Sequence, residues 1–528
     1  MTGRDVRDLL LAPHLAPEAA AALLAPYGFR DQPQADRNLQ ALAKDPLDRA
    51  LAAEILEDLL LGLARSADPD GALDRLERFF RASGAAAPVL SHLKAAPRAI
   101  DLLARTFGAS PFLAEILIRH PTWLYWVSDP EVLAHGRRRA EIESDVARAL
   151  APLPSEERRK DALRLAWRRE MLHIGVRDLL RLASVEETLG ALSALAEALI
   201  QMAYDVAGAA LREDHGMAPA RPSSRGRPGR GFTVLGLGKL GGSELNFSSD
   251  VDLVFVCASD DGRMGRGRSA PSRSAYYAAL ARRVTAVLGD VTSEGYMHRV
   301  DLRLRPDGNL GGVAPSLRAC QEYYRTRGAT WERLALLKAW PVAGDRSLGL
   351  RFLTGVRPFI YARPFDAAAL EEVREIKRRI DRKVALRDES LRNVKLGVGG
   401  IREVELLVQS LQVRFGDARP TIRERNTLRV LDRLRTTGLL SPAESETLVE
   451  AYLFLRDVEN KLQMVAGAQT HSLPESPEEL RLCARRLGYT DGTEADAGQA
   501  LLRAYRAHTD SVHRLFLEVL GGGRLEVG

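Results

Sequence analysis

One stretch near the middle of the chain, Gly231–Cys257, constrains the fold more than any other. Its sequence, GFTVLGLGKLGGSELNFSSDVDLVFVC, is an apolar strand pattern, a glycine-rich turn, a short polar segment and a second strand pattern that begins with two aspartates. Elsewhere strand patterns are few, and the commonest pattern along the 528-residue chain is apolar side chains at helical spacing. The chain is therefore predicted to be mainly α-helical with one α+β insert that contains a small mixed sheet.

The length of 528 residues exceeds what one ordinary core accommodates, so several domains are expected. The segment Met217–Arg230 is rich in Pro, Gly, Ser and Arg, which is typical of a linker. We predict a helical region, the α+β insert, a C-terminal helical bundle and a flexible tail, at residues 1–218, 219–345, 346–520 and 521–528.

Further elements are expected on both sides of the predicted boundary between residues 345 and 346. Apolar spacing and strand-like alternation predict a strand at Tyr296–Leu304 and helices at Ala275–Gly289, Leu317–Ala339, Phe365–Arg387 and Ile401–Phe415.

Composition excludes several classes of protein. The net charge of +6 comes without a basic tail or interleaved aromatic residues, so nucleic acid is not an expected partner. The three cysteines form no C-x-x-C pair, which favours reduced thiols in a cytoplasmic protein. No signal pattern and no apolar run of membrane-spanning length is evident, so no membrane association is expected.

The glycine-rich turn is open to two interpretations. Gly236-Leu-Gly238-Lys-Leu-Gly241 matches the G-x-G-x-x-G pattern of dinucleotide-binding folds. That pattern should open a full helix and lead to a strand that ends in a single acidic residue. Here a short polar segment follows instead, and the next strand begins with Asp250-Val-Asp252. A dinucleotide site is therefore the weaker interpretation.

The stronger interpretation is a metal-dependent phosphate site. Residues i and i+2 of a strand share a face, so Asp250 and Asp252 would present two carboxylates to one side. Neighbouring carboxylates repel, and Mg²⁺ relieves this while also binding phosphate oxygens. Gly241 and Gly242 would let backbone N–H groups approach a phosphate closely, and Lys239 would add a cation.

A third carboxylate is available in the predicted strand Tyr296–Leu304. Alternation places Asp301 on one polar face with Arg303 and Arg305. If this strand pairs with the D-x-D strand, Asp301 completes a two-metal site, and the arginines neutralise phosphate charge. The alternative is a polar strand face that balances its own charges.

Other charged residues lie on predicted helices. Arg164 and Arg177 belong to a charge-rich segment that is either a solvated face or a source of phosphate contacts. Lys338 is either part of a structural helix or a nucleotide contact. Arg402, Glu403 and Glu405 follow the turn at residues 399–400, where a helix N-terminus binds an anion or its acids complement the helix dipole.

The glycine pair, the D-x-D strand and the third acid resemble the polymerase-β-like nucleotidyltransferase superfamily. Longer stretches resemble the glutamine synthetase adenylyltransferase family: GLGKLGGSELNFSSDVDLVFV, VDLRLRPDGNLGG, YYRTRGATWERLALLKAWPVAGD, KLGVGGIREVELLVQ, REMLHIGVRDLL and ENKLQMVAGAQTHSLP. The resemblance implies that residues 219–345 form the nucleotidyltransferase core. It also implies Mg²⁺ on Asp250, Asp252 and Asp301, and phosphate at Gly241, Gly242 and Ser243.

Members of that family carry two such cores, one attaching AMP from ATP to a tyrosine of glutamine synthetase and one removing it by phosphorolysis to ADP. The phrase ELNFSSD resembles the N-terminal, adenylyl-removing half, and one acidic triad is found here. Removal of AMP is therefore the expected activity, with glutamine synthetase, ATP or ADP and inorganic phosphate as partners. Forward AMP transfer and a catalytically silent module that binds glutamine synthetase or a PII-type signalling protein are the alternatives.

Overall fold

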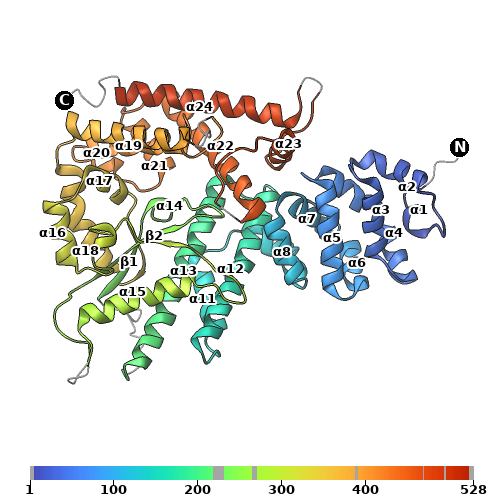
Figure 1. Ribbon diagram of the computed structural model, residues 1–528, viewed down its shortest axis with the longest axis horizontal. Helices are drawn as coiled ribbons and strands as arrows, with labels where there is room; N and C mark the ends of the chain where they lie inside the picture. The colour runs from blue at the N-terminus through green and yellow to red at the C-terminus, as the bar shows by residue number, and fades with distance from the viewer. Residues whose placement is uncertain are drawn as a thin grey trace. The chain divides into compact units, whose positions relative to one another are not determined.

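The computed structural model describes residues 5–217, 231–264, 270–386, 391–467, 469–492 and 495–521. Helices dominate this part of the chain, and its four strands form one small mixed sheet (Figure 1). The predicted mainly helical class is therefore confirmed. The chain divides into two compact units, each made of segments that lie far apart in the sequence. The consecutive regions expected from the sequence stay a prediction.

The first unit comprises Met1–Gly136, Arg168–Thr188 and Asp457–Ala504. Its helices are α1 (Asp8–Leu11), α2 (Pro17–Leu24), α3 (Gln32–Leu42), α4 (Pro46–Arg65), α5 (Pro69–Ser83), α6 (Ala86–Ala95), α7 (Arg98–Ala109), α8 (Pro111–Arg119), α9 (Trp123–Val127), α10 (Pro130–Ala134) and α23 (Pro477–Arg486). Phe79 of α5 and Phe107 of α7 meet edge to face in its core, with ring centroids 5.8 Å apart.

The second unit comprises Arg137–Trp167, Leu189–Arg456 and Tyr505–Gly528. Its helices are α11 (Arg139–Leu150), α14 (Gly238–Gly241), α15 (Arg273–Gly289), α16 (Leu317–Thr326), α17 (Thr330–Leu336), α18 (Arg346–Arg357), α19 (Ala367–Ala385), α20 (Ile401–Phe415) and α21 (Thr427–Thr436). Four long helices contribute residues to both units: α12 (Glu156–Leu179), α13 (Val185–Asp214), α22 (Pro442–Ala466) and α24 (Ala497–Gly521).

The sheet belongs to the second unit and has the order β3-β2-β1-β4. Its strands are β1 (Phe232–Gly236), β2 (Val251–Cys257), β3 (Val300–Asp301) and β4 (Trp340–Gly344). β1 pairs antiparallel with both β2 and β4, whereas β2 and β3 are parallel. Every residue of β2 is buried except Asp252, which is partly exposed. The strand is thus fixed by apolar packing and presents one carboxylate at its beginning.

Aromatic packing fixes helices to this sheet. The ring of Phe232 in β1 stacks on Phe255 of β2, on Tyr204 of α13 and on Tyr277 of α15, with ring centroids 5.5–5.9 Å apart. Helix α18 also packs on β1 and β4. These contacts make β1 and β2 a rigid base for the turn that joins them.

Several expected elements differ from those observed. The predicted strand Tyr296–Leu304 is reduced to the two residues of β3, because Arg303 turns back to bond Asp301. The predicted helix Leu317–Ala339 is broken into α16 and α17, and Trp340–Gly344 forms a strand that sequence patterns did not reveal. The helices predicted at Ala275–Gly289, Phe365–Arg387 and Ile401–Phe415 are confirmed to within a few residues.

Two predicted helix-surface arginines are buried. Arg164 is fully buried, and its guanidinium donates to the carbonyl of Gly295 at 2.7 Å and to that of Lys160 at 2.8 Å. Arg177 is also buried and donates to the carbonyl of Leu133 at 3.1 Å. Neither the solvated face nor the phosphate contact is correct for these two side chains, because carbonyl groups satisfy them internally.

The long helix α13 differs from one expectation drawn from the sequence. Among the described residues, α13 is a helix long and apolar enough to cross a membrane by length and composition, although no such run was expected. Of its most apolar window, 78% is buried inside the protein, as in the core helices of many proteins.

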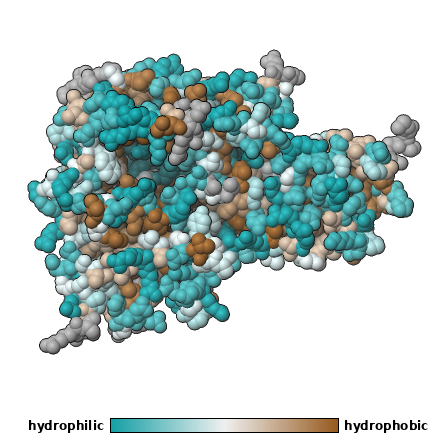
Figure 2. Space-filling view, viewed as in Figure 1, coloured by the Kyte–Doolittle hydropathy of each residue, from teal (hydrophilic) through white to brown (hydrophobic). Residues whose placement is uncertain are grey.

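The face drawn in Figure 2 is mostly hydrophilic, with apolar residues in small groups. Most of the predicted linker Met217–Arg230 and of the tail 521–528 lies outside the described residues.

Candidate active site

Two of the predicted carboxylates lie on neighbouring strands. The parallel register of β2 and β3 pairs Asp252 with Asp301, and Asp250 immediately precedes β2. The structure thus brings the third acid beside the D-x-D motif, as the sequence interpretation required.

Asp252 is a partly exposed carboxylate with two acidic neighbours, Asp301 and Asp250. Its pKa is raised to about 6, first by burial and then by the negative charge of Asp301, while Lys395 opposes this shift. Asp250 raises the pKa further, and Arg303 lowers it. Because the surroundings disfavour the ionised form, this side chain is the one that a bound cation would stabilise most.

The two flanking carboxylates are each held by an arginine. Arg299 Nε donates to Asp250 Oδ1 at 2.7 Å, and Arg303 Nε donates to Asp301 Oδ2 at 2.9 Å. The bond from Arg303 is also the main reason why the pKa of Asp301 lies below its usual value. These two bonds are consistent with the alternative in which the strand that carries Asp301 balances its own charges, and they leave Asp252 as the acid without such a bond to an arginine.

The donor set suits a hard divalent cation such as Mg²⁺, because Asp250, Asp252 and Asp301 supply carboxylate oxygens. Across the described part of the chain, no three His, Cys, Asp or Glu side chains already converge closely enough to hold a metal. The arginine bonds to the two outer acids are consistent with this. A Cβ at Gly238 would lie 2.5 Å from Asp252 Oδ2, so the glycine leaves space beside that carboxylate. The assignment of Asp250, Asp252 and Asp301 as metal ligands stays a prediction, and the chemistry of these residues fits it.

The glycine-rich turn forms the short helix α14. The backbone N–H groups of Gly241, Gly242 and Ser243 each donate to a carbonyl of the preceding turn at 3.0 Å. These are the residues expected to cradle phosphate, and their amides are bonded within the turn. The glycine that lies beside the Asp252 carboxylate is Gly238, whose φ of +52° favours glycine. Gly238 was not among the site residues predicted from the sequence.

Gly241 permits a close approach of two backbone segments. A Cβ at this position would lie 2.0 Å from the carbonyl oxygen of Lys338 and 2.5 Å from that of Gly236. The absence of a side chain at Gly241 therefore allows α14 to pack directly against the segment between α17 and β4.

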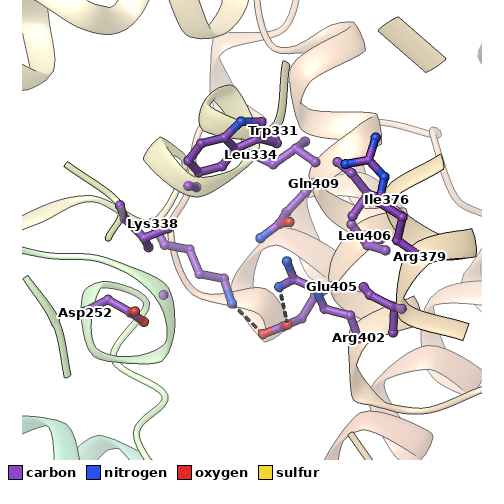
Figure 3. Close-up of a pocket in the computed structure, with 14 residues that line it drawn as sticks. Asp252, Trp331, Leu334, Lys338, Ile376, Arg379, Arg402, Glu405, Leu406 and Gln409 are labelled. Carbon is purple, nitrogen blue, oxygen red and sulfur yellow. Dashed lines mark hydrogen bonds and ion pairs between the residues drawn. The ribbon is translucent and has the colours of Figure 1, made fainter. Parts of the chain in front are cut away.

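A cavity of about 600 Å³ opens beside Asp252 (Figure 3). This volume lies in the range of small-molecule sites. The cavity is lined by Gly238, Asp252, Leu304, Trp331, Leu334, Ala335, Lys338, Ile376, Arg379, Ile380, Arg402, Glu405, Leu406 and Gln409. Figure 3 shows Asp252 on one side of this space and Ile376 and Arg379 on the other, so the acid lies at one edge of an elongated site.

Lys338 lines the cavity, but its ammonium group is bonded to the protein. Nζ donates to Glu244 Oε2 at 2.7 Å, to Glu405 Oε1 at 3.1 Å and to Thr427 Oγ1 at 3.1 Å. Burial alone would lower the pKa of Lys338, but the two glutamates outweigh burial and raise it. Of the two interpretations of Lys338, these contacts support the structural one.

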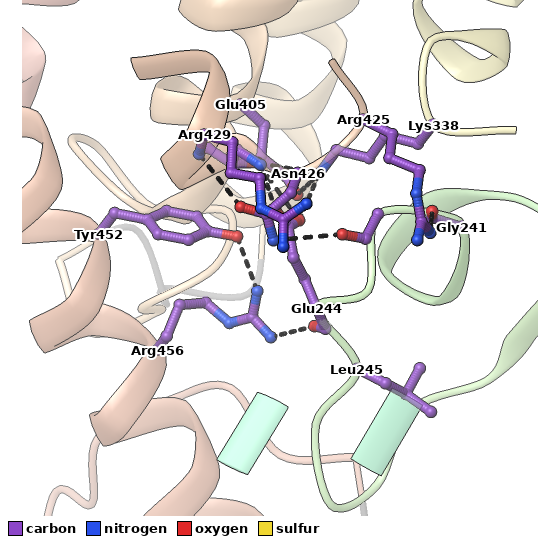
Figure 4. A network of polar contacts seen from close by, with 12 residues as sticks. Gly241, Glu244, Leu245, Lys338, Glu405, Arg425, Asn426, Arg429, Tyr452 and Arg456 are labelled. Carbon is purple, nitrogen blue, oxygen red and sulfur yellow. Dashed lines mark hydrogen bonds and ion pairs between the residues drawn. The ribbon is translucent and has the colours of Figure 1, made fainter. Parts of the chain in front are cut away.

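The same network fixes the glycine turn to the segment before α21 (Figure 4). The guanidinium of Arg425 donates to the carbonyl of Gly241, and Asn426 Nδ2 donates to the carbonyl of Gly242 at 3.3 Å. Glu244 accepts a further bond from the backbone N–H of Thr427. The glycine-rich turn beside Asp252 is thereby held through the carbonyl groups of Gly241 and Gly242 and through the side chain of Glu244.

The remaining predicted residues lie near the acids with different partners. Arg305 is buried, and its Nη1 donates to the carbonyl of Leu302 at 2.7 Å. Lys239 follows Gly238. Burial alone would raise the pKa of Glu405, but Lys338, Arg402 and Lys239 outweigh burial and lower it. A phosphate contact stays a prediction for Arg305, for Lys239 and for Arg303.

The first turn of α20 holds charges that pair with side chains. Arg402 Nη1 donates to Glu405 Oε2 at 3.2 Å. Glu403 is buried against Lys377 at 2.8 Å and His513 at 3.0 Å. These acids hold cationic side chains of the protein, a role that neither sequence interpretation included.

Three residues of the site were missed from the sequence: Gly238, Glu244 and Gln409. Glu244 offered a weak signal, because it is an acid next to an apolar residue in a segment predicted to be short. Gln409 lies seven residues after Arg402 and thus on the same face of α20, a signal that helical spacing could have supplied.

Comparisons with known proteins identify relatives of most of the chain. Residues 100–355 match the glutamate-ammonia ligase adenylyltransferase family, and residues 374–520 match the GlnD PII-uridylyltransferase family. Three similar proteins are called bifunctional glutamine synthetase adenylyltransferase/adenylyl-removing enzymes. That of Xanthomonas campestris pv. campestris (strain B100) is 40% identical over 79% of this chain, that of Rhizobium meliloti (strain 1021) 38% over 79%, and that of Shewanella woodyi (strain ATCC 51908 / MS32) 36% over 81%.

These matches cover a limited part of the relatives. The aligned regions span 42%, 42% and 43% of the three proteins, respectively, which is less than half of each. The resemblance recognised from the sequence motifs is confirmed.

The buried Lys338 network predicts a large effect of a single substitution. Lys338→Met leaves Glu244 and Glu405 buried without their cation, which should lower stability by about 3–5 kcal/mol. Urea unfolding followed by circular dichroism measures this loss. The matched control is Arg325→Met, which breaks an exposed pair with Glu322 and should leave the urea midpoint nearly unchanged, because solvent screens such a pair. Equal, small losses for both variants would contradict the network.

The close packing at Gly241 predicts that even a methyl group is not tolerated. Gly241→Ala should lower the urea midpoint clearly, because its Cβ would overlap the carbonyl of Lys338. Gly312→Ala is the control, since a Cβ there meets nothing within 4 Å. An unchanged midpoint for Gly241→Ala would show that the turn is not held in this way.

The charge at Asp252 predicts a separation of stability from metal binding. Asp252→Asn removes a disfavoured negative charge, so in EDTA the variant should melt at or above the temperature of the unsubstituted chain. Mg²⁺ at tenfold its Kd should stabilise the unsubstituted chain by about 1.4 kcal/mol, and the variant much less.

The control for this comparison is Asp261→Asn, at an exposed acid. It should keep the full response to Mg²⁺ in thermal melting. If Asp252→Asn and Asp261→Asn respond alike, Asp252 is not a metal ligand.

Proposed function

Because this chain belongs to the glutamine synthetase adenylyltransferase family, we propose that it is a Mg²⁺-dependent nucleotidyltransferase that removes AMP from a tyrosine of glutamine synthetase. The observation that carries the proposal is the pairing of Asp252 with Asp301 across β2 and β3, beside Gly238 and at the edge of a cavity of about 600 Å³. Acids on neighbouring strands next to a glycine turn support the assignment of a polymerase-β-like core to residues 219–345.

In the proposed reaction, an oxygen of inorganic phosphate attacks the phosphorus of the AMP–tyrosine linkage. The bond from phosphorus to the tyrosine oxygen breaks, the leaving oxygen gains the proton that hydrogen phosphate loses, and ADP and the free tyrosine hydroxyl are released. Mg²⁺, held by Asp250, Asp252 and Asp301, would supply Lewis-acid stabilisation of the developing charge. No covalent enzyme intermediate is needed, because positioning and charge neutralisation provide the catalysis.

The protein's own residues contribute position and charge. Arg299 and Arg303 already bond the outer acids, so they lie where phosphate oxygens would need cations. Gly238 keeps space beside Asp252 for the reacting group. The network around Lys338 fixes the turn, so that the acids keep their positions when substrate binds.

Partners and location follow from the same proposal. Glutamine synthetase is the protein substrate, and the names of the relatives support it. A PII-type signalling protein is the proposed regulator, supported by the match of residues 374–520 to a PII-uridylyltransferase family. The three free, buried cysteines suit the cytoplasm, where thiols stay reduced.

Forward transfer of AMP from ATP is the second candidate, because the same acids serve both directions. One experiment separates the two. The chain is incubated with adenylylated glutamine synthetase, inorganic phosphate and Mg²⁺, and ADP is quantified by chromatography. In parallel, labelled ATP and unmodified glutamine synthetase are supplied, and AMP incorporation is measured.

ADP release that requires phosphate, without AMP incorporation, is the expected result. Asp252→Asn should lower the rate by about a thousandfold or more, as expected for loss of a major electrostatic contribution, whereas the Asp261→Asn control should keep it. Incorporation of AMP without ADP release would reverse the assigned direction. The absence of both activities would favour the silent binding module.

A further inference from the structure

Gln409 is a polar side chain that the contacts described so far leave unexplained. It projects from α20 into the cavity (Figure 3), where only 5% of the residue is exposed. Its Oε1 has no hydrogen-bond partner among the described residues. A buried carbonyl oxygen without a partner costs about 1–3 kcal/mol, so a ligand that bonds it would gain correspondingly.

The walls around this amide are apolar and aromatic. Leu334, Ile376 and Leu406 line the same cavity. Trp331 also lines it, and this large apolar residue is 42% exposed. Figure 3 shows Trp331 on one side of the space into which Gln409 points. A flat ring beside an unpaired amide suits a heteroaromatic ligand with polar atoms on its edge.

The cavity is therefore divided chemically. Asp252 lies at one side, with Gly238 next to it, where a metal and phosphate would bind. Gln409 and Trp331 lie apart from Asp252 (Figure 3). A ligand that fills both parts must join a phosphate to a flat ring, as a nucleotide does.

We infer that Gln409 and Trp331 form the nucleobase subsite, in which Trp331 covers the face of adenine and the Gln409 amide bonds its edge. This inference rests on the proposed function, which supplies the adenylyl group. Adenine offers an amino donor beside a ring-nitrogen acceptor, and a carboxamide offers the matching acceptor and donor. A tyrosine ring has one hydroxyl and no such pair, so the protein substrate's side chain fits this subsite less well.

The test compares two ligands on two proteins. ADP and purine riboside 5′-diphosphate, which lacks the amino group of adenine, are titrated by calorimetry in Mg²⁺ against the unsubstituted chain and Gln409→Met. The unsubstituted chain should bind ADP about tenfold more tightly than the analogue, the ratio expected for one hydrogen bond to a buried group. Gln409→Met should bind both ligands alike.

Pyrophosphate is the control ligand, because it reaches only the metal and phosphate side. Its affinity should be the same for both proteins, which also shows that Gln409→Met is folded. Trp331→Leu, at a partly exposed position, should weaken ADP binding about tenfold and leave pyrophosphate unchanged, while Trp331→Phe should lose less.

The outcomes separate this inference from the proposed function. Unchanged discrimination in Gln409→Met, or no binding of ADP to the unsubstituted chain, would overturn the subsite even if AMP is removed from glutamine synthetase. Loss of discrimination in Gln409→Met would support the subsite even if the chain releases no ADP from that substrate.

Discussion

The ammonium of Lys338 is the interaction on which the arrangement of the site depends. It joins Glu244, at the end of the glycine turn, to Glu405 on α20 and to Thr427 at the start of α21. A buried cation between two buried acids tolerates no loss of a partner, because each remaining charge would lack compensation. The turn, the cavity wall and the C-terminal helices of this unit are therefore coupled through one side chain.

The candidate active site holds a charge that disfavours folding. Asp252 stays at the start of a buried strand, although burial and Asp301 both disfavour its charge. The outer acids are neutralised by Arg299 and Arg303, so the unfavourable charge is concentrated on one carboxylate. Such an arrangement is typical of sites whose charge is completed by a ligand, and it gives a physical reason why acids gather at this point.

The sequence predicted the parts of the site that depend on local patterns. The two-residue period of a strand gave Asp252 its orientation, and the pattern around Asp301 correctly indicated pairing, although the strand proved short. The partners of Lys338 and Arg164 could not be predicted, because they lie far away in the sequence and charged helical residues usually face solvent. Gly238 was missed because its importance depends on a backbone angle and on a contact with another strand.

We propose that Asp252 and Asp301 hold a divalent cation at the edge of the cavity beside Gly238. The most direct measurement is anomalous X-ray diffraction from crystals of the chain grown with Mn²⁺ and ADP, because Mn²⁺ takes oxygen ligands like Mg²⁺. We expect an anomalous peak within bonding distance of both carboxylates, with Arg303 displaced from Asp301. An anomalous peak elsewhere, or bound ADP with these two acids still free of metal, would contradict the account.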